Sequence, residues 1–106
     1  MSETTYPIER PRFRTKVIEC GLELAIVLPG VSKEALTVNV EDRLLSISGE
    51  RRFESGAEER DYQLQLRLHD DLDPSKIEAS HQNGVLRLKL SKRPELTPRR
   101  IDILAN

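Results

Sequence analysis

Alternation of apolar and polar residues runs through most of the chain and constrains its fold more than any other feature. The clearest case is the stretch 62–68, where an apolar residue occupies every second position. Successive side chains of a β-strand point to opposite faces, so a period of two residues predicts strands with one buried face. The same period recurs at 22–28, 36–41, 45–48 and 85–90. The sequence therefore predicts an all-β fold.

Short turn signals separate these strands. Asn83-Gly84 lies between 77–81 and 85–90, and an Asn-Gly pair is typical of a two-residue β-hairpin. Pro29-Gly30 ends the strand at 22–28, and Asp42-Arg43 predicts another tight turn. About seven short strands joined in this way predict a β-sandwich of two antiparallel sheets.

Two segments carry helical rather than strand signals. Residues 32–35 form one, and the other begins at Asp73-Pro74, with aspartate as an N-cap and proline in the first turn. We expect a short helix at each place.

The composition limits the classes of function. The 106 residues suffice for one domain, and 17 basic against 18 acidic groups leave a net charge of −1. This balance, without a basic run, argues against nucleic acid and anionic membrane surfaces as partners. The longest apolar stretch, 22–31, contains Glu23 and Pro29, so no membrane span is expected. The first five residues lack the features of a signal peptide.

Cysteine usage points to a reducing compartment. Cys20 is the only cysteine, which excludes an internal disulfide and fits a cytoplasmic location. We expect Cys20 to be a small, partly buried residue. An intermolecular disulfide is the alternative.

Catalytic and metal-binding patterns are absent from the sequence. The five glycines lack the spacing of a phosphate-binding loop, which argues against nucleotide use. His69, His81 and Cys20 do not stand at metal-ligand spacing, and the acidic run 70–73 lacks the glycine and distal glutamate of a calcium loop. No nucleophile-elbow motif surrounds a serine. We therefore expect no catalytic residue, no metal and no cofactor, and both histidines at the surface or at the edge of a groove.

The C-terminal tail presents two β-branched side chains. Ile101 and Ile103 flank Asp102, so in an extended chain both isoleucines point to one side. Pro94 and Pro98 keep the tail from forming a helix. The pattern predicts that the tail docks on an apolar surface, with packing on its own subunit as the alternative.

Four blocks of sequence, in order, resemble the small heat-shock proteins, which are ATP-independent chaperones built on an α-crystallin domain. Any one block is weak, but the order and spacing over about 17–104 are specific. The blocks are Leu28-Pro29-Gly30-Val31-Ser32-Lys33-Glu34, then Leu44-Leu45-Ser46-Ile47-Ser48-Gly49-Glu50-Arg51, then Ala79 with Asn83-Gly84-Val85-Leu86, and finally Ile101-Asp102-Ile103.

The resemblance implies an immunoglobulin-like β-sandwich over 16–92, with an N-terminal arm at 1–15 and a C-terminal extension at 93–106. It also implies a holdase that binds unfolding client proteins and prevents their aggregation, as a homodimer or small homo-oligomer. In the family, the Ile-x-Ile segment inserts into an apolar groove of a neighbouring subunit. In this chain the groove residues are expected to be Val38, Val40, Ile77 and Ala79.

Three departures from the family pattern affect assembly. The arm is shorter than usual, and the connection 50–61 is too short for the strand that bacterial and plant members exchange between partners. Leu64 stands where the family usually has an arginine. The candidate dimer strand is therefore the edge of 62–68, with Tyr62, Leu64 and Leu66, and the absence of a dimer is the alternative. A CS-type co-chaperone adaptor, with the same sandwich, is the alternative function.

Overall fold

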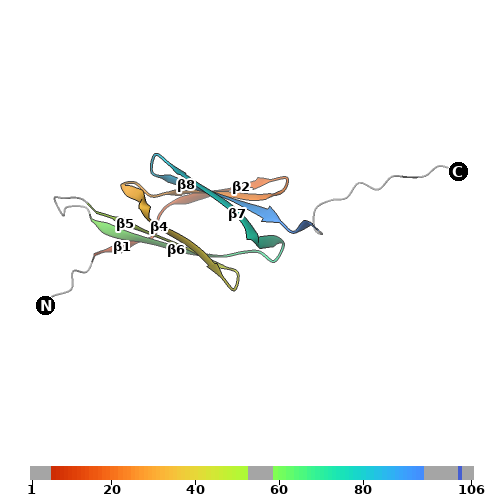
Figure 1. The fold of residues 1–106 in the computed structure, drawn as a ribbon, viewed down its shortest axis with the longest axis horizontal. Helices are drawn as coiled ribbons and strands as arrows, with labels where there is room; N and C mark the ends of the chain where they lie inside the picture. The colour runs from red at the N-terminus through yellow and green to blue at the C-terminus, as the bar shows by residue number, and fades with distance from the viewer. Residues whose placement is uncertain (1–5, 53–58, 95–102, 104–106) are drawn as a thin grey trace.

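Two four-stranded sheets stacked face to face form the molecule (Figure 1). The computed structural model describes residues 6–52, 59–94 and 103. The first sheet has the order β1-β6-β5-β4, with β1 at Ile8–Glu9, β6 at Arg60–Arg67, β5 at Leu44–Arg51 and β4 at Val31–Glu41. The second has the order β2-β3-β8-β7, with β2 at Phe13–Ile18, β3 at Gly21–Val27, β8 at Val85–Lys92 and β7 at Leu72–Gln82. The predicted β-sandwich is confirmed.

All strand pairs are antiparallel except the short parallel pair of β1 with β6. The alternating residues of the sequence form the core between the sheets, and no polar or charged residue of the described chain is buried there. A fully buried Leu or Ile side chain contributes roughly 1.5–3 kcal/mol, so this core is the main stabilising term. The buried residues of the four central strands are Leu24, Ile26, Leu45, Ile47, Tyr62, Leu64, Leu86, Leu88 and Leu90.

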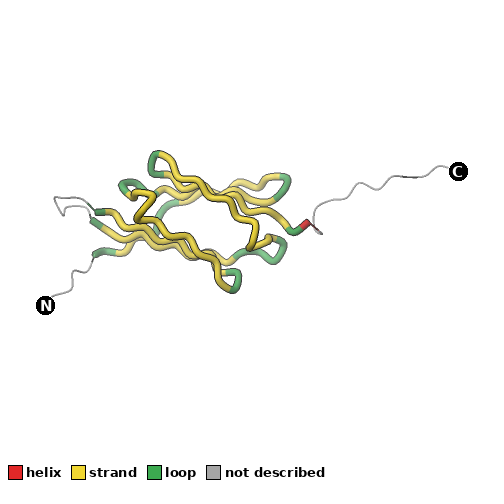
Figure 2. The backbone as a smooth tube through the Cα atoms, viewed as in Figure 1, coloured by secondary structure: helices red, strands yellow, loops and turns green. Residues whose placement is uncertain are grey.

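Tight two-residue turns join the hairpins β2–β3, β4–β5 and β7–β8, and Figure 2 shows how little of the fold lies outside the strands. Asn83 and Gly84 have φ of 53° and 75°, and Gln82 pairs with Val85 across them. Positive φ at both central residues is the type I′ geometry that matches strand twist. The predicted hairpin therefore forms.

Both predicted helices are wrong, because residues 32–35 belong to β4 and residues 73–82 to β7. Each coincides with a shift in strand register, between Val31 and Leu36 in β4 and between Leu72 and Ile77 in β7. β4 and β7 each pair on one side only, so a local irregularity breaks one ladder of hydrogen bonds and not two. The helix-like residues mark irregular segments of the edge strands.

Part of the predicted arm belongs to the sandwich. β1 pairs with Asp61 and Tyr62 of β6, and β2 begins at Phe13. The candidate dimer strand is β6, whose Tyr62 and Leu64 side chains are buried in the core. One edge of β6 pairs with β5 along its length, and β1 covers the other edge only at its N-terminal end. A second copy would therefore meet the backbone of β6 rather than these side chains.

Candidate functional site

The edge strands β4 and β7 lie on the same side of the sandwich, one from each sheet (Figure 1). Hydrogen bonds join the two strands at both ends. At one end the Leu28 N–H donates to the Gly84 carbonyl at 2.7 Å, which joins the turn before β4 to the turn after β7. At the other end the Arg43 side chain reaches the Leu72 carbonyl at 3.1 Å. Between these ties each strand has a free backbone edge, and such edges accept an added strand.

Apolar side chains line the inner faces of these two strands. On β4, the inward residues lie opposite buried residues of β5 and are half-buried. On β7, the inward residues lie opposite buried residues of β8 and are half-buried or exposed. We call these six residues the rim: Leu36, Val38, Val40, Ile77, Ala79 and His81. Beneath the rim lie fully buried neighbours of β5 and β8, which are Leu45, Ile47, Leu86, Leu88 and Leu90.

The structure places the four predicted groove residues in the rim. Val38, Val40 and Ile77 are half-buried and pack against the core, whereas Ala79 is exposed. Sequence reasoning left His81 undecided between surface and groove edge, and its Nε2 atom is buried without a hydrogen-bond partner in the described chain. The periodic pattern of β7 was the signal that could have assigned it to the inner face.

Arg43 holds the turn after β4 against the start of β7, and sequence reasoning missed this role. Its Nη1 donates to the carbonyls of His69 and Leu72, each at 3.1 Å, and its own carbonyl accepts from Leu68 N–H at 2.7 Å. Its Nε lies 3.8 Å from Asp70, at the distance of a weak ion pair. Arg43 has a φ of 64°, a conformation in which residues other than Gly, Asn and Asp are uncommon. The sequence signal was the predicted tight turn at Asp42-Arg43, in which Arg43 is the second of the two central residues.

A local turn at the start of β7 takes the place of the predicted helix cap. The Asp73 carboxylate accepts hydrogen bonds from the Ser75 hydroxyl at 2.6 Å and from the Ser75 N–H at 2.9 Å. These bonds lower the pKa of Asp73, since they favour the charged carboxylate. The stabilisation is present above the ordinary carboxyl pKa and is lost as pH falls through the lowered value.

The predicted anchor lies mostly outside the described residues. Ile101 is not among them, and Ile103 is described with 92% of its surface exposed. His69 lies at the surface, where its Nδ1 accepts from the Asp71 N–H at 3.1 Å. Cys20 is half-buried, as expected.

Four of the signature residues form the hairpin between β7 and β8, and the fifth, Ala79, lies in the rim. Asn83 and Gly84 form the turn, Val85 and Leu86 begin β8, and a Cβ on Gly84 would lie 3.4 Å from the Cα of Pro29. The φ of 75° at Gly84 therefore favours glycine at this place more than the packing does.

On the opposite side of the sandwich, charged contacts fix β1 and the N-terminal end of β6. The Arg52 guanidinium lies 3.5 Å from the centre of the Tyr6 ring and 2.7 Å from the Asp61 carboxylate. The hydrogen bond to Asp61 is the main cause that raises the pKa of Arg52. Arg60 contacts Glu9 at 2.8 Å, and the Asp61 N–H donates to the Pro7 carbonyl at 2.8 Å. These contacts hold β1 against β6.

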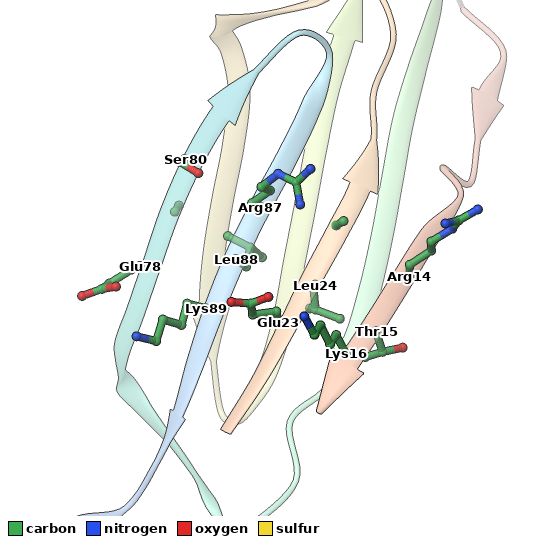
Figure 3. Close-up of a pocket in the computed structure, with 12 residues that line it drawn as sticks. Arg14, Thr15, Lys16, Glu23, Leu24, Glu78, Ser80, Arg87, Leu88 and Lys89 are labelled. Carbon is green, nitrogen blue, oxygen red and sulfur yellow. The ribbon is translucent and has the colours of Figure 1, made fainter. Parts of the chain in front are cut away.

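A hollow of about 670 Å³ lies on the outer face of the second sheet (Figure 3). Charged side chains of all four strands stand around it, mostly on the face away from the core. Within the described residues no group of three or more His, Cys, Asp or Glu side chains is arranged to hold a metal ion. The hollow is lined by Arg14, Lys16, Glu23, Glu78, Arg87 and Lys89, among others.

Comparisons with known proteins agree with this architecture. The model of the Hsp20/alpha crystallin family matches residues 15–104, and the chain belongs to this family. The 18 kDa antigen 2 of Mycobacterium avium is 39% identical over 87 residues, which cover 74% of this chain and 63% of that protein. The 23.2 kDa heat shock protein of Oryza sativa subsp. japonica is 44% identical over 85 residues, which cover 66% of this chain and 40% of that protein.

Solved structures lead to the same family. A small heat-shock protein from Xylella fastidiosa, described as having a distinct high order structure, superposes with a TM-score of 0.74 at 30% identity, covering 90% of this chain and 96% of that one. The hspA of Xanthomonas axonopodis gives a TM-score of 0.72 at 30% identity, covering 81% of this chain and 96% of that one.

Family membership supports a chaperone role, and members of the family are chaperones rather than enzymes. The matching family model favours the small heat-shock reading over the CS-type adaptor. The chain spans less than two thirds of the length of the two relatives named above. No helix among the described residues is long and apolar enough to cross a membrane.

Proposed function

We propose that this chain is an ATP-independent holdase that binds non-native polypeptides at the β4–β7 rim and assembles by docking Ile101 and Ile103 of one copy on the rim of another. The observation that carries the proposal is the pair of edge strands β4 and β7. Among the described residues each of them pairs on one side only, and their inner side chains are mostly apolar and half-buried. The 92% exposure of Ile103 in the single chain supports it, because an exposed isoleucine gains by burial elsewhere.

The magnitude of the docking energy fits a reversible contact. Burying two isoleucines offers roughly 3–6 kcal/mol before the costs of association and ordering are subtracted. The net affinity of one tail is therefore weak. Several tails within one assembly act together through high effective concentration, while each contact still exchanges.

Clients would compete for the same rim. An unfolding protein exposes extended apolar segments, which offer the backbone and side-chain chemistry of the tail. Neither mode of binding needs a nucleotide or a cofactor. We expect unfolding proteins and further copies of the chain as partners, without nucleic acid or membrane, in the cytoplasm.

The test of holdase activity is light scattering from a heat-denatured client in nucleotide-free buffer, with equimolar chain present. The chain should slow aggregation, and the double variant Val38→Thr with Val40→Thr should do so less well, because hydroxyl groups then occupy the rim. Val17→Thr is the matched control, since Val17 is 80% exposed on β2, away from the rim. Equal aggregation with and without the chain would contradict the proposal.

The test of assembly is native mass spectrometry of Ile101→Ala with Ile103→Ala. We expect this double variant to form a smaller assembly than the unmodified chain. An unchanged mass would show that the tail is not an intersubunit anchor.

A further inference from the structure

Charges of alternating sign cross the outer face of the second sheet in one row. The strand registers pair Lys16 with Glu23, Glu23 with Lys89, and Lys89 with Glu78, so the row runs positive, negative, positive, negative across β2, β3, β8 and β7. Opposite charges on neighbouring strands attract each other. Figure 3 shows these four side chains on the outer face, around the hollow described above.

The row ends on a free negative charge. Glu78 is exposed and belongs to β7, which has no neighbour beyond β8 among the described strands. In Figure 3 its carboxylate extends past β7 on the side away from β8. Within the described part of the chain Glu78 makes no ion pair. A strand added to β7 would place its own outward side chain beside this carboxylate.

The tail has a matching charge at the required position. Ile101 and Ile103 face the rim if the tail docks as proposed above, so Arg100 and Asp102 face the outer surface. We propose that the tail of a second copy pairs with β7 so that Arg100 lies beside Glu78 and continues the charge row. Glu78 is thus a specificity residue that sets the register of the docked tail. This inference rests on the proposed docking of Ile101 and Ile103.

Other registers with the isoleucines inward do not give this match. Among the outward residues in the regularly paired part of β7, Glu78 is the only acidic one, and the others are Ser80 and Gln82. An antiparallel tail with Arg100 beside Ser80 brings Asp102 beside Glu78, where like charges repel. A parallel tail with Arg100 beside Ser80 leaves both charges without a partner on β7. Arg100 reaches Glu78 in either strand direction, so the pairing does not depend on the direction of the tail.

Charge reversal in the full-length chain tests this pairing. Glu78→Arg alone and Arg100→Glu alone should each raise the concentration at which the assembly dissociates, by about 1.5- to 5-fold for one docked tail and more where several tails act together. The double variant restores opposite charges and should return the dissociation concentration close to that of the unmodified chain. Native mass spectrometry over a dilution series measures the dissociation concentration, and urea unfolding checks that each variant is folded.

Glu23→Arg is the matched control, because Glu23 stands in the same row but two strands away from the free edge of β7. Arg100→Glu should not compensate Glu23→Arg. Single reversals that leave the assembly unchanged, or a double variant no better than the singles, would overturn the register. The variant Ile101→Ala with Ile103→Ala separates the two proposals. If it shrinks the assembly while the charge reversals do not, the anchor stands and only the register fails.

Discussion

The two sides of the sandwich differ in how they treat their edge strands. On the side of β4 and β7 the inner faces of the edges are apolar, and polar contacts of the described chain join them mainly at the two ends, at Leu28 and at Arg43. On the side of β1 and β6, ion pairs and the stacking of Arg52 on Tyr6 hold β1 against the N-terminal end of β6. Charged edges resist pairing with other chains, whereas an apolar edge invites it.

The contrast fits the proposed function, in which extended segments bind on one side of the sandwich. In that proposal the open edges of β4 and β7 are the docking place. The buried layer beneath the rim is continuous with the core. Under the proposal, stability and binding are divided between neighbouring residues of the same strands.

The largest expected effect tests whether the rim and the buried layer beneath it contribute differently to the free energy of unfolding. Leu88 is 1% exposed, and Leu88→Ala should lower the free energy of unfolding by about 2–5 kcal/mol because it leaves a cavity. Val38 is half-buried, so Val38→Thr should cost at most about 1 kcal/mol while weakening client binding. Urea unfolding measures both. Equal decreases in stability would show that the rim is part of the rigid core.

A smaller effect is expected where the open side is tied at Arg43. Arg43→Ala removes two hydrogen bonds from a charged donor, and it should cost about 1–3 kcal/mol of unfolding free energy. Arg43→Gly removes the same bonds but suits a φ of 64°, so it should be about 1 kcal/mol more stable than the alanine variant. Urea unfolding of the two variants side by side separates the contacts from the backbone strain. If glycine is the worse of the two, this account of the turn is wrong.

The smallest effect is expected on the side of β1 and β6. Arg52→Gln removes the ion pair with Asp61 and the stacking on Tyr6, so β1 should open more often from β6. Hydrogen exchange at the Asp61 amide, which donates to Pro7, should become several-fold faster, with client protection unchanged. Arg10→Gln is the control, since Arg10 lies 5.8 Å from the Phe13 ring and makes no contact with Arg52 or Asp61. A failure of Arg52→Gln to protect clients would remove the contrast between the two sides.

Much of the fold could be predicted because its signals are local and repeated. The two-residue period places the core residues of β3, β5, β6 and β8 correctly, and the Asn83-Gly84 pair predicts its hairpin. The same period predicts that the residues of the rim share an inner face, whereas their role as a groove was predicted only from the resemblance to a family. The helices predicted near Ser32 and Asp73 failed because short polar segments satisfy their backbone in several ways. Asp73 binds Ser75 N–H in a turn as readily as it would cap a helix.

The sequence by itself determined the strands with a regular two-residue period and which of their faces are apolar, since a side chain's direction in a strand depends only on its position. Only the tertiary structure decided which strands lie at the edges, because that depends on pairing between segments far apart in the chain. It placed β4 and β7 on one side, brought Arg43 to the Leu72 carbonyl, and put Glu78 at the free end of a charge row. These contacts join residues too distant in sequence for any local pattern to relate.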